Sequence, residues 1–240
     1  MEPFLKAKYA AVTGGTRGIG FAIAESLLRC GASVAICGRT PESVERASAA
    51  LKQSTGGDVL GVPADVSKWD QVEQFFAAVR SAFGALDILV NNAGAGVFRP
   101  IQDLTLEDWR NTIDLNLTGA FNCCHHALPL MLDSGSGYIV QIGSLAGVNA
   151  FAGGAAYNAS KFGLIGFSDA IMHDLRYQNI RVSCIMPGSV DTAFSSRSGP
   201  ADWKIAPRDV AEVVLSLLRM PERTLVSRVE MRPSKPKKNG

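Results

Sequence analysis

The sequence has few of the residues that mark zinc proteins, disulfide-stabilised secreted proteins and nucleic-acid-binding proteins. Only three histidines occur, and the five cysteines, Cys30, Cys37, Cys123, Cys124 and Cys184, include no CxxC pair. An odd cysteine count without a disulfide pattern favours a reducing compartment, and the spacing predicts no metal site. The formal net charge of +2 gives the body of the chain no electrostatic reason to bind nucleic acid or a membrane surface.

Long hydrophobic runs are also missing. The first nine residues contain no apolar run of signal-peptide length, and no stretch approaches the roughly 20 apolar residues of a membrane span. We therefore expect a cytoplasmic protein without a membrane partner. The 240 residues, 47% of them hydrophobic, are enough for one large α/β domain and exclude a disordered chain.

Short apolar runs alternate with segments of helical period along the chain, which indicates a parallel sheet covered by helices on both faces. No repeat or linker divides the sequence, so we expect residues 1–233 to form one domain. The basic residues 234–240 are expected to be a flexible, solvated tail, the alternative being a nucleic-acid-binding arm. The predicted strands are 9–13, 33–37, 59–62, 86–90, 138–142, 181–185 and 225–231; the predicted helices are 18–30, 41–53, 68–83, 105–132, 155–177 and 207–219.

A glycine-rich segment joins the first predicted strand to the first predicted helix. It reads Gly14-Gly15-Thr16-Arg17-Gly18-Ile19-Gly20. Glycines let the backbone adopt unusual dihedral angles and approach a pyrophosphate, which the amides and the dipole of a helix N-terminus stabilise. The context of strand, glycines and helix favours a dinucleotide cradle over the alternative, a tight turn that binds nothing.

The spacing of Gly14, Gly18 and Gly20 resembles that of the short-chain dehydrogenase/reductase family. The resemblance covers residues 8–192 and implies a Rossmann-type, doubly wound sheet of seven parallel strands in the order 3-2-1-4-5-6-7. It also implies nicotinamide-dependent hydride transfer and a homodimer or homotetramer. Further motifs follow in the family's order and spacing: Asp65-Val66, Asn91-Asn92-Ala93-Gly94, Asn116, Ser144, Tyr157-Asn158-Ala159-Ser160-Lys161, Pro187-Gly188 and Thr192.

The end of the second predicted strand identifies the cofactor. An acidic residue normally binds the ribose 2′-hydroxyl of NAD at this place, whereas here Arg39 follows Gly38 and no carboxylate occurs before Glu42. Arg39 and Arg17 together suit a 2′-phosphate, because each guanidinium can form charge-assisted bidentate bonds. The sequence therefore predicts NADP(H) rather than NAD(H), the alternative being that both arginines are ordinary solvated residues.

The resemblance implies the remaining cofactor contacts. Asp65 would accept from the adenine amine beside the Val66 amide, and Lys161 would bind the nicotinamide ribose. The other implied contacts are Gly14, Thr16, Gly18, Ile19 and Gly20 in the loop; Asn92, Ala93 and Gly94 at the adenosine ribose; and Tyr157, Pro187, Gly188, Val190 and Thr192 near the nicotinamide.

The catalytic candidates are Tyr157, Lys161, Ser144 and Asn116. Tyr157 and Lys161 are four residues apart and share one helix face. An ammonium beside the phenol would lower its pKa, so that Tyr157 serves as acid and base for a carbonyl or alcohol oxygen that Ser144 orients. Asn116 resembles the family's fourth catalytic residue, which holds a water linking Lys161 to solvent through a distortion of its helix.

The substrate pocket is expected around Phe98, Val148, Phe151 and Phe194, with no arginine placed to hold a substrate carboxylate. These residues favour an apolar or amphiphilic carbonyl compound. Within the family that the chain resembles, the 3-oxoacyl-carrier-protein reductases are functional neighbours. Their C-terminus is rich in glycine, whereas the C-terminus of this chain is basic. A general carbonyl or 3-hydroxy-acid reductase is therefore an equal alternative. A catalytically silent NADP(H)-binding regulator is the alternative from another functional class.

Overall fold

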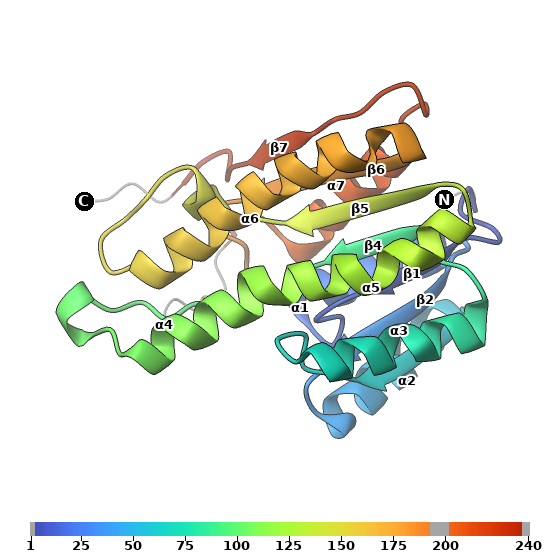
Figure 1. Ribbon diagram of the computed structural model, residues 1–240, viewed down its shortest axis with the longest axis horizontal. Helices are drawn as coiled ribbons and strands as arrows, with labels where there is room; N and C mark the ends of the chain where they lie inside the picture. The colour runs from blue at the N-terminus through green and yellow to red at the C-terminus, as the bar shows by residue number, and fades with distance from the viewer. Residues whose placement is uncertain (1–2, 193–201, 237–240) are drawn as a thin grey trace.

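Seven parallel strands form one sheet in the order β3-β2-β1-β4-β5-β6-β7 (Figure 1). The computed structural model describes residues 3–192 and 202–236. The strand order changes direction between β1 and β4, and a ligand crevice forms at such a switch point in open α/β sheets. The predicted fold class is confirmed. The strands are β1 (Tyr9–Val12), β2 (Ser33–Gly38), β3 (Val59–Pro63), β4 (Ile88–Asn91), β5 (Gly137–Ile142), β6 (Ile180–Pro187) and β7 (Arg228–Met231).

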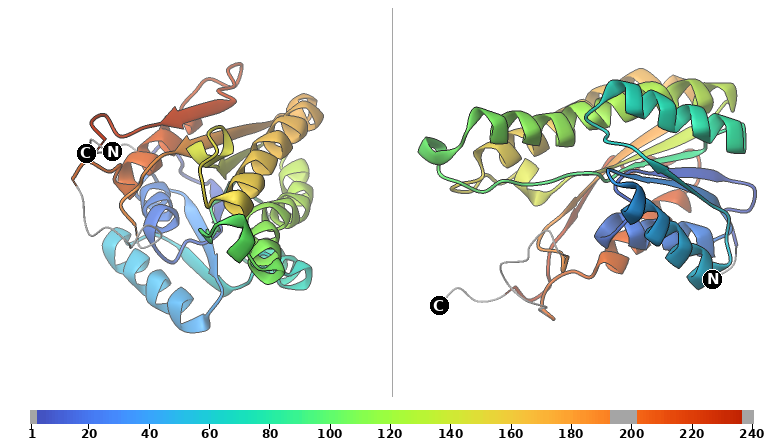
Figure 2. Two further views of the ribbon diagram at one scale, coloured as in Figure 1. Left: turned by 90° about the vertical axis from the view of Figure 1, so that its left-hand side faces the viewer. Right: turned by 90° about the horizontal axis from the view of Figure 1, so that it is seen from below.

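Helices cover both faces of the sheet, as Figure 2 shows from two directions. One layer contains α1 (Gly18–Arg29), α2 (Pro41–Thr55) and α7 (Pro207–Leu218). The other contains α3 (Trp69–Phe83), α5 (Gly119–Asp133) and α6 (Ala155–Leu175), and α4 (Leu106–Ile113) extends it beyond the sheet. Each layer buries its own apolar core, because the strands carry apolar side chains on both faces. Short 3₁₀ turns lie at Ile101–Asp103, Leu145–Gly147 and Arg176–Gln178.

The helix predicted over 105–132 has an interruption that its apolar pattern does not indicate. A π-helix, Asp114–Thr118, joins α4 to α5, so the backbone widens without breaking. The last strand is also shorter than predicted, since it begins at Arg228 rather than at residue 225.

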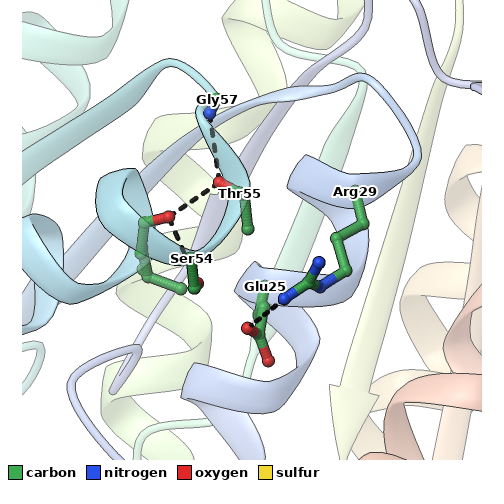
Figure 3. Close-up of polar contacts among 6 residues, drawn as sticks. Glu25, Arg29, Ser54, Thr55 and Gly57 are labelled. Atoms are coloured by element: carbon green, nitrogen blue, oxygen red, sulfur yellow. Dashed lines mark hydrogen bonds and ion pairs between the residues drawn. The ribbon is translucent and has the colours of Figure 1, made fainter.

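Polar side chains close the helices beside the first two strands (Figure 3). Thr55 donates its hydroxyl to the Leu51 carbonyl at 2.7 Å and accepts from the Gly57 amide at 3.1 Å, which closes the end of α2. On α1, Arg29 pairs with Glu25 one turn earlier at 2.9 Å. The Thr55 bonds fix the turn that leads α2 into β3, at the amino-terminal ends of the strands, opposite the site described next.

Candidate active site

A large cavity lies at the carboxyl ends of the strands, the edge that faces the viewer in Figure 2 (left). Its volume is about 1160 Å³. Small-molecule pockets usually measure about 300 to 1,000 Å³, so this cavity has room for a dinucleotide together with a second small molecule. Its walls include the loops after each strand from β1 to β6, the first half of α6 and the segment after β7.

The glycine loop is held in shape by hydrogen bonds to the end of β4. Gly14 and Gly18 have φ values of 62° and 56°, which favour glycine. The Thr13 hydroxyl accepts from the backbone amides of Asn92 and Ala93, both at 3.0 Å, and the Asn92 side chain donates to the Gly14 carbonyl at 3.2 Å. The N-terminus of α1 therefore faces the cavity from a loop already in shape for an anion.

Gly20 was expected to contact the cofactor, but it lies behind this loop and not in the cavity wall. Its close packing leads to a prediction about stability. A Cβ at this position would collide with the Gly14 carbonyl and the Asn92 amide. Gly20→Ala is therefore expected to lower the free energy of unfolding by about 1 to 3 kcal/mol, measured by urea denaturation. The matched control is Gly166→Ala in α6, where nothing lies within 4 Å, so that alanine is expected to be neutral or stabilising. Equal stability of the two variants would contradict the prediction.

Two arginines stand at one end of the cavity, where the adenosine of a nicotinamide cofactor is expected. Arg17 precedes α1, Arg39 follows β2, and both are exposed residues that line the wall. The Thr16 methyl group packs against Gly38, where an added Cβ would lie 2.6 Å from it. This close contact keeps the glycine loop and the loop after β2 together. Guanidinium groups suit the geometry of a phosphate, and the contact of these two arginines with a cofactor phosphate stays a prediction.

Asp65 is not brought into the wall, although its neighbours Ala64 and Val66 are. Its carboxylate accepts from the Ser67 amide at 3.0 Å and from the Ser67 hydroxyl at 2.8 Å. The side chain thus closes the turn before α3, and its contact with adenine stays a prediction.

Ser144, Tyr157 and Lys161 meet in the centre of the cavity wall. Ser144 follows β5, and the other two lie one turn apart in the first half of α6. The Tyr157 hydroxyl forms a hydrogen bond with the Ser144 side chain. The Lys161 ammonium lies 5.9 Å from the centre of the Tyr157 ring and donates to the Ile142 carbonyl at 2.9 Å.

Burial has the largest effect on the pKa values of Tyr157 and Lys161. Desolvation raises the pKa of Tyr157 above its usual value, and the hydrogen bond from Ser144 only partly opposes it. Burial favours the neutral phenol, and the expected lowering of that pKa by Lys161 stays a prediction. Burial also lowers the pKa of Lys161 to about 8.

Asn116 lies on the π-helix, so the helix distortion that its expected role requires is present. The side chain is buried behind the cavity wall. Its amide donates to the Ala95 carbonyl at 2.8 Å and to the Ser160 hydroxyl at 2.9 Å, and its oxygen accepts from the Ala95 amide at 2.9 Å. Asn116 thereby ties the loop after β4 to the helix that carries Tyr157.

Aromatic side chains line the cavity beyond Tyr157. The Phe98 ring lies 5.8 Å from Phe151 and meets Tyr157 edge-on at 5.5 Å between ring centres. Val148 was expected here too, but it packs against the small core cluster of Ile165, Cys184 and Met186 instead. Phe194 lies outside the described residues.

Other residues of the site lack a motif of their own, and sequence reasoning missed the role of Asn158. The Asn158 amide donates to the Ala146 carbonyl at 2.6 Å, and its oxygen accepts from the Phe151 amide at 3.4 Å, which folds the loop after Ser144 onto α6. Its place inside the Tyr157–Lys161 motif was the available signal. Further lining residues include Leu145, Asn149, Ser189, Trp203, Arg232, Pro233 and Pro236. Pro236 belongs to the segment that was expected to be a solvated tail.

Residues 3–192 and 202–236 lack the features of a metal site and of a membrane-spanning helix. No group of three or more His, Cys, Asp or Glu side chains in this part of the chain could hold a metal ion. His125 and His126 instead pack against Trp69, with ring centres at 4.9 and 4.4 Å, and so join α5 to α3. No described helix combines the length and the apolar character needed to cross a membrane.

Known proteins are similar to this chain in sequence and in fold. An uncharacterized oxidoreductase of Staphylococcus aureus (strain USA300) is 34% identical over 94% of this chain and 97% of its own. A 3-oxoacyl-[acyl-carrier-protein] reductase of Chlamydia muridarum is 39% identical over 80% of this chain and 77% of its own. The crystal structure of a metagenomic short-chain oxidoreductase in complex with NADP superposes with a TM-score of 0.85, at 34% identity, covering 97% of this chain and 99% of that one.

The family model described as short chain dehydrogenase matches residues 8–203, which includes the glycine loop, Ser144, Tyr157 and Lys161. Together with the strand order and the relatives of similar length, this match establishes that the chain is an oxidoreductase of the short chain dehydrogenase family.

Proposed function

We propose that the protein is an NADP(H)-dependent reductase of carbonyl compounds, interconverting a ketone or aldehyde and an alcohol. The observation that carries the proposal is the meeting of Ser144, Tyr157 and Lys161 in one cavity with the glycine loop and two arginines. This arrangement supports the proposal, because a phenol, a hydroxyl and a cation beside a dinucleotide-sized space could serve as acid, orienting group and charge stabiliser.

The residues present fit NADP(H). The positive-φ glycines and the N-terminus of α1 would hold the pyrophosphate, and Arg17 and Arg39 would hold the 2′-phosphate. NADP is also the ligand named for the metagenomic relative. The backbone and side chains near the ends of β5 and β6 would face the nicotinamide: Lys161, Pro187, Gly188, Val190 and Thr192. When bound, the cofactor supplies the hydride.

The chain itself supplies the proton. Because burial keeps the Tyr157 phenol protonated at neutral pH, it can donate a proton to the carbonyl oxygen as that oxygen becomes negative. The Ser144 hydroxyl, already bonded to Tyr157, would donate to the same oxygen and hold it in place. The Lys161 ammonium would stabilise the phenolate that remains, and Asn116 would hold the helix geometry that supports this group.

The aromatic lining favours an apolar or amphiphilic carbonyl compound, and a 3-oxoacyl thioester is one candidate, given the acyl-carrier-protein reductase among the relatives. A homodimer or homotetramer, formed through α5 and α6, is part of the same proposal. Phe121 and Phe162 on these helices are about half exposed and would be covered in such an assembly.

The direct test follows the absorbance of NADPH, and separately of NADH, with acetoacetyl thioesters, diketones and quinones as substrates. Consumption of NADPH with at least one of them is the expected result. Tight binding of NADPH without turnover of any would support the alternative, a regulator that binds the cofactor without catalysis.

The pH dependence of reduction should reflect Lys161. Its ammonium, with a pKa of about 8, is present below that pH and lost above it. Since the charged form stabilises the phenolate, kcat/KM for reduction is expected to be level between pH 6 and 7.5 and to fall tenfold per pH unit well above 8. Initial rates between pH 6 and 10 with NADPH measure this. A profile that stays level to pH 10 would contradict this role of Lys161.

A further inference from the structure

The chain that leaves β7 runs along the cavity. β7 pairs with β6 in parallel, so that Met231 lies opposite Pro187, and the Gly188 amide donates to the Met231 carbonyl at 2.8 Å. The residues that follow Met231 therefore emerge beside Gly188, at the same edge of the sheet as Ser144.

Pro233 is packed into this corner. A Cβ on Gly188 would lie 3.4 Å from the Pro233 ring and 3.0 Å from the Leu145 side chain, so the three residues are in close contact. Leu145 follows Ser144 directly. The segment Arg232–Pro236 thus reaches the cavity next to the loop of the orienting serine, and Arg232, Pro233 and Pro236 line it.

The charges of the cavity give this segment a chemical role. The charged residues in the described lining are Arg17, Arg39, Lys161 and Arg232, all of them basic. The first two are assigned to the cofactor phosphates and Lys161 to the catalytic group. Arg232 is the remaining positive charge, and it stands beside Gly188 and Pro233 rather than at the adenosine end.

The Arg232 guanidinium is paired with Glu230 at 2.6 Å, two residues back along the strand. Both side chains are well exposed, at 57% and 45%, and an ion pair in water adds little stability. A ligand anion can therefore replace Glu230 at small cost. The planar guanidinium also suits carboxylate and phosphate groups, which it binds through two parallel hydrogen bonds.

We propose that Arg232 is a specificity-determining residue that binds an anionic group of the substrate, a carboxylate or a phosphate, away from the reacting carbonyl. This inference rests on the proposed reductase function. It revises the expectation that no arginine is placed to hold a substrate carboxylate. The substrate class becomes an amphiphilic ketone or aldehyde, with an apolar part against Phe98 and Phe151 and an anionic end at Arg232.

The test compares matched pairs of ketones on the wild type and Arg232→Gln: a keto acid against its methyl ester, and a ketone phosphate against its neutral alcohol. In Arg232→Gln, kcat/KM for the anionic member of one pair is expected to fall 10- to 100-fold, because one charge-assisted hydrogen bond is lost. The kcat/KM for the neutral member should not change. Whichever pair responds identifies carboxylate or phosphate as the ligand. Arg208→Gln, on the exposed face of α7, is the matched control.

Glu230→Gln provides a test in the opposite direction. Removing the competing carboxylate should lower KM for the anionic substrate several-fold, whereas KM for the neutral substrate should not change. Equal losses for charged and neutral ketones in Arg232→Gln, or no loss for either, would overturn the proposal.

Binding measurements distinguish a failure of the Arg232 proposal from a failure of the proposed reductase function. If no ketone is reduced by the wild type, the same pairs are titrated against the tryptophan fluorescence of the protein, since Trp203 lines the cavity. Tighter binding of the anion that is lost in Arg232→Gln supports the site even without turnover. Equal affinity for anion and neutral analogue rejects it.

Discussion

Replacement of Tyr157 by phenylalanine is expected to lower kcat for carbonyl reduction by about 10³-fold, within the range typical for removal of a general acid. The substitution deletes one hydroxyl, and the edge-on contact between Phe98 and the ring can remain. The Ser144 hydroxyl loses its partner, yet it keeps the bond that it accepts from the Ala146 amide at 3.1 Å. The fold and the dinucleotide cradle should therefore be unaffected.

The measurement is single-turnover NADPH oxidation at saturating substrate, together with a fluorescence titration that gives the Kd of NADPH. The Kd should change less than threefold while the rate falls. Tyr177→Phe removes the same hydroxyl from a side chain that is 90% exposed in the turn after α6, and it should keep the wild-type rate. If Tyr157→Phe retained a tenth or more of the rate, the proton would have to come from another group.

The layered fold could be predicted from the sequence because its signals are local. Apolar runs such as Ile88-Leu89-Val90, separated by segments of helical period, specify a parallel sheet with both faces covered, and the structure follows this pattern closely. The glycine loop was equally readable, since Gly14 and Gly18 occupy left-handed conformations that other residues adopt only at a cost.

Features that depend on tertiary packing were harder to predict. The π-helix around Asn116 arises where the helix must meet both the Ala95 loop and Ser160, and an apolar pattern does not encode these contacts. The inward direction of Val148 depends on the 3₁₀ turn after Ser144. The course of the chain after Met231 depends on the pairing of β7 with β6, whereas the composition of residues 234–240 alone suggested a solvated tail.

The pKa of Tyr157 shows the same limit in chemical terms. The spacing of Tyr157 and Lys161 correctly placed both groups on one helix face, but burial of the site could not be measured from spacing. In the structure, desolvation favours the neutral form of each group, raising the pKa of the phenol and lowering that of the ammonium to about 8. A protonated phenol beside a cation is the arrangement that a carbonyl reductase needs before hydride transfer.

The second large effect is expected at Arg39, which should control the choice between NADPH and NADH. Arg39→Asp is expected to weaken NADPH binding by about 100-fold or more, because it removes a charge-assisted bidentate contact and places a carboxylate near the 2′-phosphate. The same carboxylate can accept from the 2′-hydroxyl of NADH, so NADH binding should be unchanged or tighter. Arg17, which also lines the cavity, would remain in this variant, so we expect some affinity for the phosphate to be kept.

Fluorescence titrations with both cofactors measure this change as the ratio of the two Kd values. Arg46→Asp makes the same charge change on the exposed side of α2, outside the cavity wall, and should leave the ratio within about threefold of the wild type. Because both variants change the net charge equally, a general weakening of attraction for the more negative cofactor would appear in both. A shift confined to Arg39→Asp assigns the preference to the guanidinium at the end of β2, whereas an unchanged ratio would show that Arg39 does not contact the phosphate.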